Sequence, residues 1–378
     1  MRDAVTIVGS GPAGLTAAIT LARRGYAVTV CEQHSDVGFR FHNDFQGLEN
    51  WSSDSDVLAE LRSYGLQPDC ECVPVSNGVL FTPDGEELSL VSSQPAFYLV
   101  RRGSAGGTLD QSLRRQAEQQ GVQIVFNKRI DKFEGEAIVA TGPKGADILA
   151  AGVTFETSHD DVAAMVFDDT LAPKGYAYLL VHNGKGTMAS VLYRDFHNSD
   201  AYRNACLEFF LARLGLNLSD SRPFGGFGNF FMRRSQVRNS KTYIGEAAGF
   251  QDYLWGFGMR YAIRSGYIAA QCLINGTDYN EQWKAHLRPA LRASLANRFL
   301  FERLGQRGYG VLARRLSRHE PSRILNHHYQ MSFSKWLFSG MARRHYVSKV
   351  KDRECTHEDC TCVWCRCVRE GHAMGIED

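Results

Sequence analysis

The sequence predicts an α/β protein with a parallel-sheet domain, a strand-rich domain inserted into it, and a helical C-terminal region. Three observations support this prediction. The first 32 residues have the pattern of a strand, a glycine-rich turn, a helix and a second strand. Strand patterns dominate residues 153–193, and helical patterns dominate residues 258–304. At 378 residues the chain also exceeds the roughly 250–300 residues that one hydrophobic core usually serves, so two lobes are expected.

The first strand, over residues 4–8, runs into the loop Gly9-Ser10-Gly11-Pro12-Ala13-Gly14. Its first glycine permits a tight turn, the second lets a pyrophosphate approach, and the third allows close helix–strand packing. A helix over residues 15–24 follows, and its N-terminus favours phosphate. Glu32 ends the second strand eighteen residues after Gly14, where a carboxylate can accept hydrogen bonds from ribose. We therefore predict a Rossmann-like dinucleotide-binding domain.

The remaining elements follow from local patterns. We expect a loop over residues 35–55, helices over 56–64, 108–120, 201–214, 258–274 and 281–304, and strands over 97–100, 123–126, 137–140, 178–181, 188–192 and 243–244. The chain returns to the nucleotide fold after the strand-rich insertion, so the domains are discontinuous. The predicted domains are 1–75, 97–150 and 238–285 for the cofactor; 76–96 and 151–237 for the substrate; 286–353 as a basic helical region; and 354–378 as a Cys-rich tail.

Two distant segments predict which dinucleotide binds. Ala140-Thr141-Gly142 after a strand resembles the Ala-Thr-Gly segment of FAD enzymes. The run from Ile244 to Gly249 resembles a Gly-Asp-Ala-Ala-Gly segment whose acid binds the ribityl chain of FAD, with Glu246 in place of the Asp. Together with the dinucleotide loop, these two segments make three that follow one another, over some 240 residues, in the order found in FAD enzymes. They favour FAD over NAD.

With these segments the chain resembles the geranylgeranyl reductase family, within the flavoproteins shaped like para-hydroxybenzoate hydroxylase. The resemblance extends from residue 4 to about residue 345 and includes the run from Gly256 to Ala262, which matches the family helix beneath the flavin. The N-terminus of that helix would stabilise negative charge on a reduced flavin. Arg40 and Arg102 are further candidates, for the cofactor phosphates. The predicted cofactor-binding residues are Gly9, Ser10, Gly11, Pro12, Ala13, Gly14, Glu32, Gln33, Arg40, Arg102, Gly142, Gly245, Glu246, Ala247, Gly256, Gly258 and Met259.

The family's substrate signature, Pro-x-x-Tyr-x-Trp-x-Phe-Pro, matches residues 173–181 in part. Pro173 and Tyr176 are kept, whereas Tyr178, Leu180 and Val181 replace Trp, Phe and Pro. The aromatic, apolar character suits a small apolar substrate. Tyr176, Tyr178 and His182 are the candidate catalytic acids, and the two tyrosines could equally fill one face of a strand.

Two functions from different classes of flavoprotein chemistry remain open. The first is a reductase of carbon–carbon double bonds in an isoprenoid or lipid-like molecule, and the second is a monooxygenase of the same fold. No second Gly-x-Gly-x-x-Gly follows a strand, so NAD(P)H would visit transiently or a donor protein would deliver electrons. The Trp-x-Trp-x-Ile-Pro signature of flavin halogenases is absent from the sequence.

The C-terminal tail carries five thiols within thirteen residues. Thiolates at this spacing can bind zinc or an iron–sulfur cluster, which would make the protein an electron relay; a Cys-rich segment without metal is the alternative. The candidate metal ligands are Cys355, Cys360, Cys362, Cys365 and Cys367.

Charge is distributed unevenly although the formal net charge is only +2. Residues 298–353 contain thirteen Lys or Arg against three acidic residues, interleaved with large apolar side chains. Such a segment suits peripheral contact with an anionic membrane, or else a solvated helix face. No signal peptide or spanning segment is recognised, and no nucleic-acid partner is expected, so the predicted location is cytoplasmic with membrane contact at the periphery.

Overall fold

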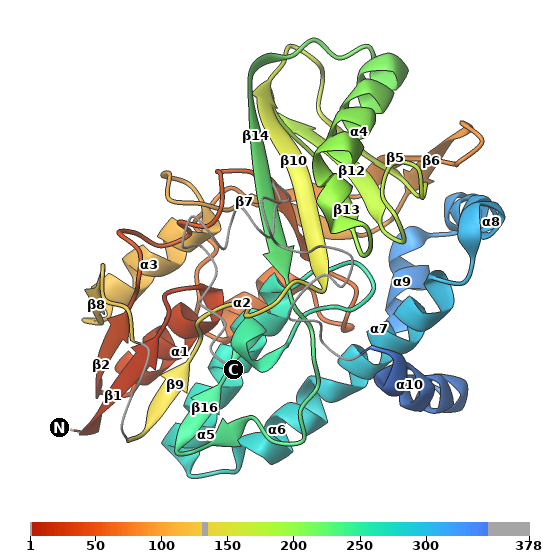
Figure 1. Ribbon diagram of the computed structural model, residues 1–378. Helices are drawn as coiled ribbons and strands as arrows, with labels where there is room; N and C mark the ends of the chain where they lie inside the picture. The colour runs from red at the N-terminus through yellow and green to blue at the C-terminus, as the bar shows by residue number, and fades with distance from the viewer. Residues whose placement is uncertain (1, 131–134, 347–378) are drawn as a thin grey trace.

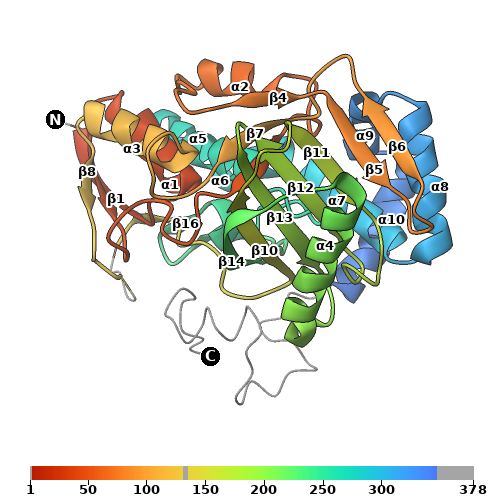
Figure 2. The same ribbon diagram turned by 90° about the horizontal axis from the view of Figure 1, so that it is seen from above.

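The computed structural model describes residues 2–130 and 135–346. Its strands form three sheets, and Figure 1 shows the first of these on the left, the second above the centre and the last four helices on the right. Figure 2 gives the same order along the molecule, so the C-terminal helices lie far from the N-terminal strand. The mixed α/β fold with a Rossmann-like domain is thereby confirmed.

The first sheet is the parallel sheet that the glycine-rich loop predicted. Its order is β15-β16-β9-β1-β2-β8, and only β15 and β16 pair antiparallel. Its strands are β1 (Arg2–Val8), β2 (Tyr26–Cys31), β8 (Gln123–Val125), β9 (Ala137–Val139), β15 (Val237–Arg238) and β16 (Lys241–Tyr243). Because the carboxyl ends of parallel strands meet at one edge, the segments after β1, β2, β9 and β16 converge there.

Helices α1 (Pro12–Ala22) and α5 (Met259–Asn275) pack against each other beside this sheet. Their approach requires glycine, because a Cβ on Gly266 would lie 2.2 Å from the Ala13 carbonyl oxygen. Helices α3 (Leu109–Gln119) and α6 (Tyr279–His286) extend this layer, α3 against α1 and α6 against α5.

The second sheet is the inserted, mainly antiparallel one, with the order β14-β10-β13-β12-β11-β5-β6. Its strands are β5 (Asn77–Phe81), β6 (Glu87–Val91), β10 (Ile148–Glu156), β11 (Val162–Val166), β12 (Tyr176–His182), β13 (Lys185–Leu192) and β14 (Ser219–Gly228). Helix α4 (Ser199–Leu214) covers one face, where Phe210 packs with Leu179. Alternation along β12 turns Tyr176, Tyr178 and Leu180 to the other face.

A third sheet, β3-β7-β4, lies between the other two with helix α2 (Val57–Ser63) beside it. Its strands are β3 (Phe45–Glu49), β4 (Val73–Val75) and β7 (Phe97–Arg101). The turns η1 (Phe196–Asn198) and η2 (Gly245–Ala248) complete the domains, and the C-terminal helices are α7 (Arg288–Phe301), α8 (Gly305–Arg318), α9 (Pro321–Tyr329) and α10 (Phe333–His345).

Two expectations about elements are corrected. Residues 35–55 are not all loop, because β3 forms there by pairing with β7, some fifty residues further along the chain. Residues 281–304 are not one helix, because α6 ends at His286 and α7 begins at Arg288. Pro289 explains the break, since proline lacks the N–H that a helix interior needs but suits the first turn of a new helix.

Candidate active site

The dinucleotide loop joins β1 to α1 in the geometry that its glycines predicted. Gly9 has φ +104°, and a Cβ there would lie 2.4 Å from the Ala140 carbonyl oxygen. A Cβ on Gly14 would lie 2.1 Å from the carbonyl oxygen of Gly9. Helix α1 begins at Pro12, which has no N–H to leave unsatisfied. The backbone itself therefore requires glycine at both ends of the loop.

Gly11 differs from these two glycines because a Cβ on it would meet no atom within 4 Å. It lines a cavity of about 460 Å³ that also contacts Thr141. The Thr141 hydroxyl is buried and has no hydrogen-bond partner in the described part of the chain, which is costly unless a ligand supplies one. Open space at Gly11 beside an unsatisfied hydroxyl fits the pyrophosphate and ribityl part of FAD.

Glu32 is fixed at the end of β2 by the loop itself. Its Oε2 accepts hydrogen bonds from the Ser10 backbone N–H at 2.9 Å and from the Ser10 hydroxyl at 2.7 Å. Its Oε1 accepts from the His34 N–H at 3.0 Å. Glu32 is buried, and both Glu32 and Gln33 line the cavity. The lone pairs of Glu32 that accept no protein hydrogen bond are therefore available to the ribose that the sequence predicts there.

The two candidate phosphate-binding arginines lie in different environments. Arg40 lines the cavity and pairs with Glu246 at 3.1 Å. Arg102 is buried, and its Nε and Nη2 donate to both carboxylate oxygens of Asp110 at 2.8 and 2.9 Å. Its guanidinium also lies over the Phe41 ring, 4.1 Å from the centroid. No local pattern predicted the pair with Asp110. Because this carboxylate already occupies its guanidinium, Arg102 has less capacity than Arg40 to bind a phosphate.

Glu246 occupies the position predicted for a ribityl contact. Burial raises the pKa of its carboxyl, and the charge of Arg40 counteracts that rise. Its Oε1 accepts from the Asn229 N–H at 3.3 Å. The side chain lines the cavity while Gly245 and Ala247 of the same turn are buried behind it, and a Cβ on Gly245 would meet the Ala13 side chain at 2.8 Å.

Helix α5 begins at the cavity wall. Gly258 is its N-cap and offers no side-chain hydrogen bond, so the first N–H groups of the helix keep their partial positive charge. Gly256 and Met259 line the cavity on either side of it. A Cβ on Gly256 would lie 2.5 Å from the Ile148 side chain. This helix start can therefore favour an electron-rich ring in the cavity.

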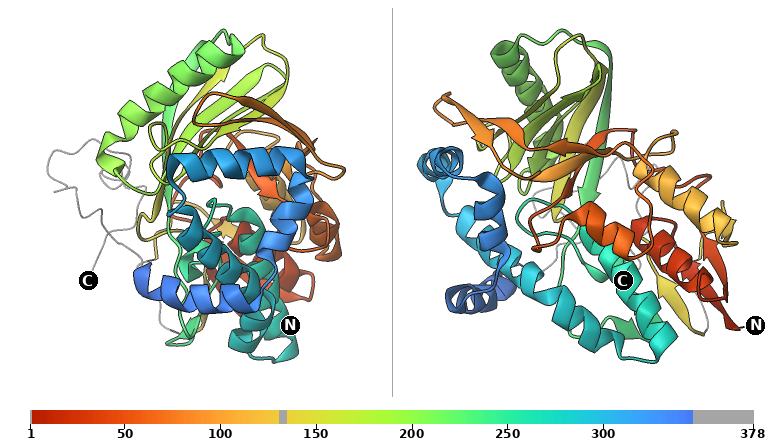
Figure 3. Two further views of the ribbon diagram at one scale, coloured as in Figure 1. Left: turned by 90° about the vertical axis from the view of Figure 1, so that its right-hand side faces the viewer. Right: turned by 180° about the vertical axis from the view of Figure 1, so that it is seen from behind.

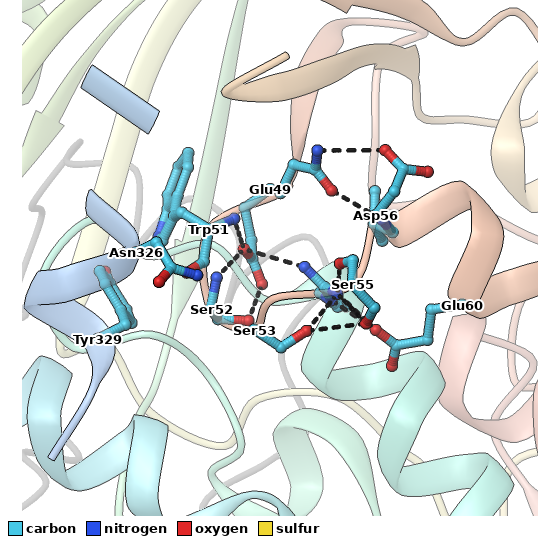
Figure 4. A network of polar contacts seen from close by, with 12 residues as sticks. Glu49, Trp51, Ser52, Ser53, Ser55, Asp56, Glu60, Asn326 and Tyr329 are labelled. Carbon is cyan, nitrogen blue, oxygen red and sulfur yellow. Dashed lines mark hydrogen bonds and ion pairs between the residues drawn. The ribbon is translucent and has the colours of Figure 1, made fainter. Parts of the chain in front are cut away.

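A buried ionic network holds α5 in place (Figure 4). Arg260 donates to Glu60 of α2 at 2.9 and 2.6 Å, and Arg264 donates to the same carboxylate at 2.6 Å. Burial raises the pKa of Glu60, but hydrogen bonds from Arg264 and the charge of Arg260 outweigh it and lower that pKa to about 2. Arg260 also reaches the Ser53 hydroxyl at 2.6 Å, which ties the loop after β3 to the helix.

The cavity continues past the helix start into an apolar chamber. The side chains that line it come from the second sheet, from β7, from the loop before α5 and from α8 and α9. They are Val79, Leu90, Phe97, Met165, Phe167, Tyr178, Leu180, Phe257, Leu316 and Leu325. Phe257 packs edge-on against Trp51 with ring centroids 4.8 Å apart. The chamber and the dinucleotide site are thus one continuous space.

Comparison with known proteins agrees with this geometry. Residues 7–49 match the NAD(P)-binding Rossmann-like domain family. The digeranylgeranylglycerophospholipid reductase of Haloferax volcanii is 24% identical over 318 residues, 70% of this chain and 74% of that protein. A geranylgeranyl bacteriochlorophyll reductase-like structure from Thermoplasma acidophilum covers 90% of this chain and 96% of its own with a TM-score of 0.65 at 16% identity.

Other solved structures share the fold. A flavin-dependent brominase matches with a TM-score of 0.63 at 16% identity, covering 90% of this chain and 97% of its own. The p-nitrophenol 4-monooxygenase of Pseudomonas putida matches with a TM-score of 0.56 at 16% identity, covering 88% and 100%. The chain has the fold of the flavin-dependent oxidoreductases among these proteins. Its resemblance to the geranylgeranyl reductases, inferred above from motifs, is confirmed.

The three candidate acids are placed differently. The Tyr176 hydroxyl donates to the Trp255 carbonyl at 2.7 Å, so it is engaged in the core. His182 bonds Asp161, lies 3.4 Å from Glu71, and is not among the residues that line the cavity. Tyr178 lines the chamber, and its hydroxyl has no hydrogen bond among the described residues. Burial raises the pKa of Tyr178, so its proton is retained.

Sequence reasoning missed several residues of the site. Gln251 donates to the Gly256 carbonyl at 2.7 Å, and its buried Oε1 has no partner in the described chain. Gln46 lines the chamber and donates to the buried Asp44 at 2.8 Å. Neither carries a local signal, because each is brought to the cavity by a strand or turn whose partner is distant. Thr141 could have been found, since it stands inside the Ala-Thr-Gly segment.

The predicted metal ligands, Cys355, Cys360, Cys362, Cys365 and Cys367, lie outside the described residues. Among residues 2–130 and 135–346 no group of His, Cys, Asp or Glu could hold a metal ion. Cys70 and Cys72 are the closest thiols there, with their Sγ atoms 3.5 Å apart. The same ranges contain no helix with the length and apolar character to span a bilayer.

Proposed function

We propose that this flavoprotein reduces a carbon–carbon double bond in an apolar, isoprenoid or lipid-like substrate. The observation that supports it is the continuity of one cavity from the dinucleotide loop to a chamber of aliphatic and aromatic side chains. A chain of methylene and methyl groups is favourable in such a chamber, because each CH₂ removed from water contributes about 0.8 kcal/mol. The sequence relationship to the Haloferax volcanii reductase supports the same substrate class.

The residues divide the work between holding the cofactor and handling the substrate. Glu32, Thr141 and the loop around Gly11 would hold FAD, with Arg40 and Glu246 beside it. When bound and reduced, FAD supplies the hydride that one carbon of the double bond accepts. The apolar walls exclude water, and the first turn of α5 favours negative charge at its end of the cavity.

The second carbon of the double bond requires a proton. Tyr178 is the group we assign to it, because its hydroxyl faces the chamber without a hydrogen-bond partner among the described residues and keeps its proton at neutral pH. Gln46 of β3 donates a hydrogen bond to the buried Asp44, which directly precedes that strand. Burial raises the pKa of Asp44 as well. The electrons would come from NAD(P)H binding transiently or from a donor protein.

The experiment uses holoprotein that has been reduced without oxygen and then mixed with a geranylgeranylated lipid. We expect the flavin absorbance to return in the absence of oxygen while the lipid gains two hydrogens for each double bond reduced. A flavin that reoxidises only when oxygen is admitted, with one oxygen atom added to the lipid, would instead identify a monooxygenase. A saturated lipid of the same length is the control, and it should leave the flavin reduced.

A further inference from the structure

The C-terminal helix α10 presents an apolar face that none of the described residues covers. Its side chains Phe333, Trp336, Leu337 and Met341 are 81%, 56%, 53% and 52% exposed. Their spacing of three, one and four residues places them on one side of the helix. The opposite side packs on α7, where Ala342 is fully buried and Phe338 lies 6.5 Å from Phe299. Large apolar side chains gathered in this way are the usual mark of a docking surface.

Helix α8 lies on the same side of the molecule as α10, as the left view of Figure 3 shows, and it carries a row of arginines. Arg307, Val311, Arg315 and Arg318 follow one another at intervals of about one turn, and all four are exposed, Val311 at 66%. None of the three arginines forms an ion pair with a carboxylate in the described chain, whereas Arg314 on the neighbouring side is neutralised by Asp84 and Glu86. Exposed apolar groups therefore lie beside uncompensated positive charge.

Helices α8 and α9 form part of the wall of the apolar chamber. Leu316 of α8 and Leu325 of α9 line it. Helix α9 is also tied to the site, because the Tyr329 hydroxyl donates to the buried Asp252 at 2.8 Å and Asn326 donates to Asp54 at 3.2 Å. Helix α8 thus separates this part of the chamber from the exposed arginines on its outer side.

We propose that α8 and α10 dock this protein on an anionic lipid bilayer, with Phe333, Trp336, Leu337 and Met341 entering the interface and the α8 arginines meeting lipid phosphates. A bilayer offers both an apolar interior and a negative rim, as this face requires. A second copy of the chain suits it less well, since a two-fold interface would bring the same arginines against each other. Delivery of a substrate through this face rests on the proposed function, whereas docking does not.

The test is flotation of full-length holoprotein with vesicles of phosphatidylcholine alone or with added phosphatidylglycerol. We expect binding to the anionic vesicles to be at least about tenfold stronger at low salt, and to weaken as salt is added. The pair Phe333→Ser and Trp336→Ser should reduce that binding about tenfold or more, and the pair Arg315→Gln and Arg318→Gln should remove the preference for anionic lipid. All four positions are exposed, so the FAD content and melting temperature should not change.

Two matched controls use exposed residues elsewhere, Leu273→Ser in the last turn of α5 and Arg222→Gln in β14, and both should bind like wild type. Quenching of tryptophan fluorescence by brominated lipid should be lost in Trp336→Phe although flotation persists. Equal binding to neutral vesicles, or unchanged binding by the serine pair, would overturn the proposal. So would a serine pair that only converts a dimer to a monomer in light scattering, or binding that appears only after residues 347–378 are removed.

These outcomes are separate from those of the reductase assay. Vesicle binding is measured without turnover. A protein that floats with vesicles but does not reduce the lipid would support the docking proposal and contradict the proposed reaction. A protein that reduces detergent-dispersed lipid but does not float would do the reverse.

Discussion

Arg260 and Glu60 form a buried, two-contact ion pair that joins the first turn of α5 to α2, with their side chains 1% and 7% exposed. Arg264 donates to the same carboxylate, and the Ser53 hydroxyl accepts a further hydrogen bond from Arg260. Because α5 begins at the cavity, this pair sets where the helix start lies relative to the dinucleotide loop. The pair is thus a positioning device for the site.

We expect Arg260→Met to lower the free energy of unfolding by about 3–5 kcal/mol, because Glu60 is left buried with part of its charge uncompensated. Thermal and urea unfolding of the holoprotein measure this. Arg323→Met is the matched control, since Arg323 pairs with Glu320 at 2.7 Å but is 83% exposed, and a solvent-exposed pair contributes little to stability. Equal losses in the two variants would show that burial of the Glu60 pair is not what matters.

Acid should weaken the same network. The pKa of Glu60 is about 2 in the folded protein against an ordinary 4.5, so the folded state binds its proton less readily than the unfolded state. Its contribution, roughly 3 kcal/mol, is therefore present above pH 4.5 and is lost as the pH falls towards 2. Urea unfolding at several pH values measures the slope, and Glu60→Gln should flatten it across that window. An unchanged slope would contradict this assignment.

The glycines of the dinucleotide loop should separate folding from cofactor binding. Gly11→Ala should fold normally as apoprotein, because no atom lies within 4 Å of the added Cβ, yet it should lose FAD since the methyl occupies the space that we assign to the cofactor. Gly9→Ala should instead destabilise the apoprotein, because the residue has φ +104° and its Cβ would lie 2.4 Å from the Ala140 carbonyl oxygen. Flavin absorbance and apoprotein melting temperatures provide the two measurements.

This contrast explains how much of the site the sequence could predict. The loop from Gly9 to Gly14 and the acid at Glu32 obey local steric and spacing rules, so they were found without a structure. The pairing of Arg102 with Asp110 could not be predicted in this way. An arginine that binds a phosphate and an arginine that pairs with a carboxylate have the same appearance in a sequence. Strand β3 was missed because its pairing with β7 is a long-range contact that no local pattern specifies.

The end of the chain shows a further limit of local patterns. The helical periodicity of residues 281–304 was correct in kind, but Pro289 signalled a break that periodicity alone passes over. The basic stretch was visible as composition, yet its division into Arg298 buried against Glu302 and Arg315 exposed on α8 depends on packing. Composition therefore located the charged region, and only the fold distinguished its surface from its core.

The last prediction compares the two tyrosines of β12, which point to the same side of the sheet and differ in what their hydroxyls contact. Tyr178→Phe should reduce turnover of the unsaturated lipid at least about tenfold, because it removes the proton donor that we assign to the chamber, and it should leave the melting temperature unchanged. Tyr176→Phe should instead lower the free energy of unfolding by about 1 kcal/mol, because it removes the hydrogen bond to the Trp255 carbonyl.

Single-turnover reoxidation of the reduced flavin by the lipid, followed across pH, distinguishes the two roles. If Tyr178→Phe removes the proton donor, reoxidation becomes slower and its solvent deuterium isotope effect becomes smaller. If the substitution changes only packing, the affinity for the lipid changes, while the reoxidation rate at saturating lipid and the isotope effect stay the same. Tyr178→Phe that reduces the lipid at the wild-type rate would transfer the role to another group. Asp44 is the next to substitute, because Gln46 links it to the chamber and burial raises its pKa.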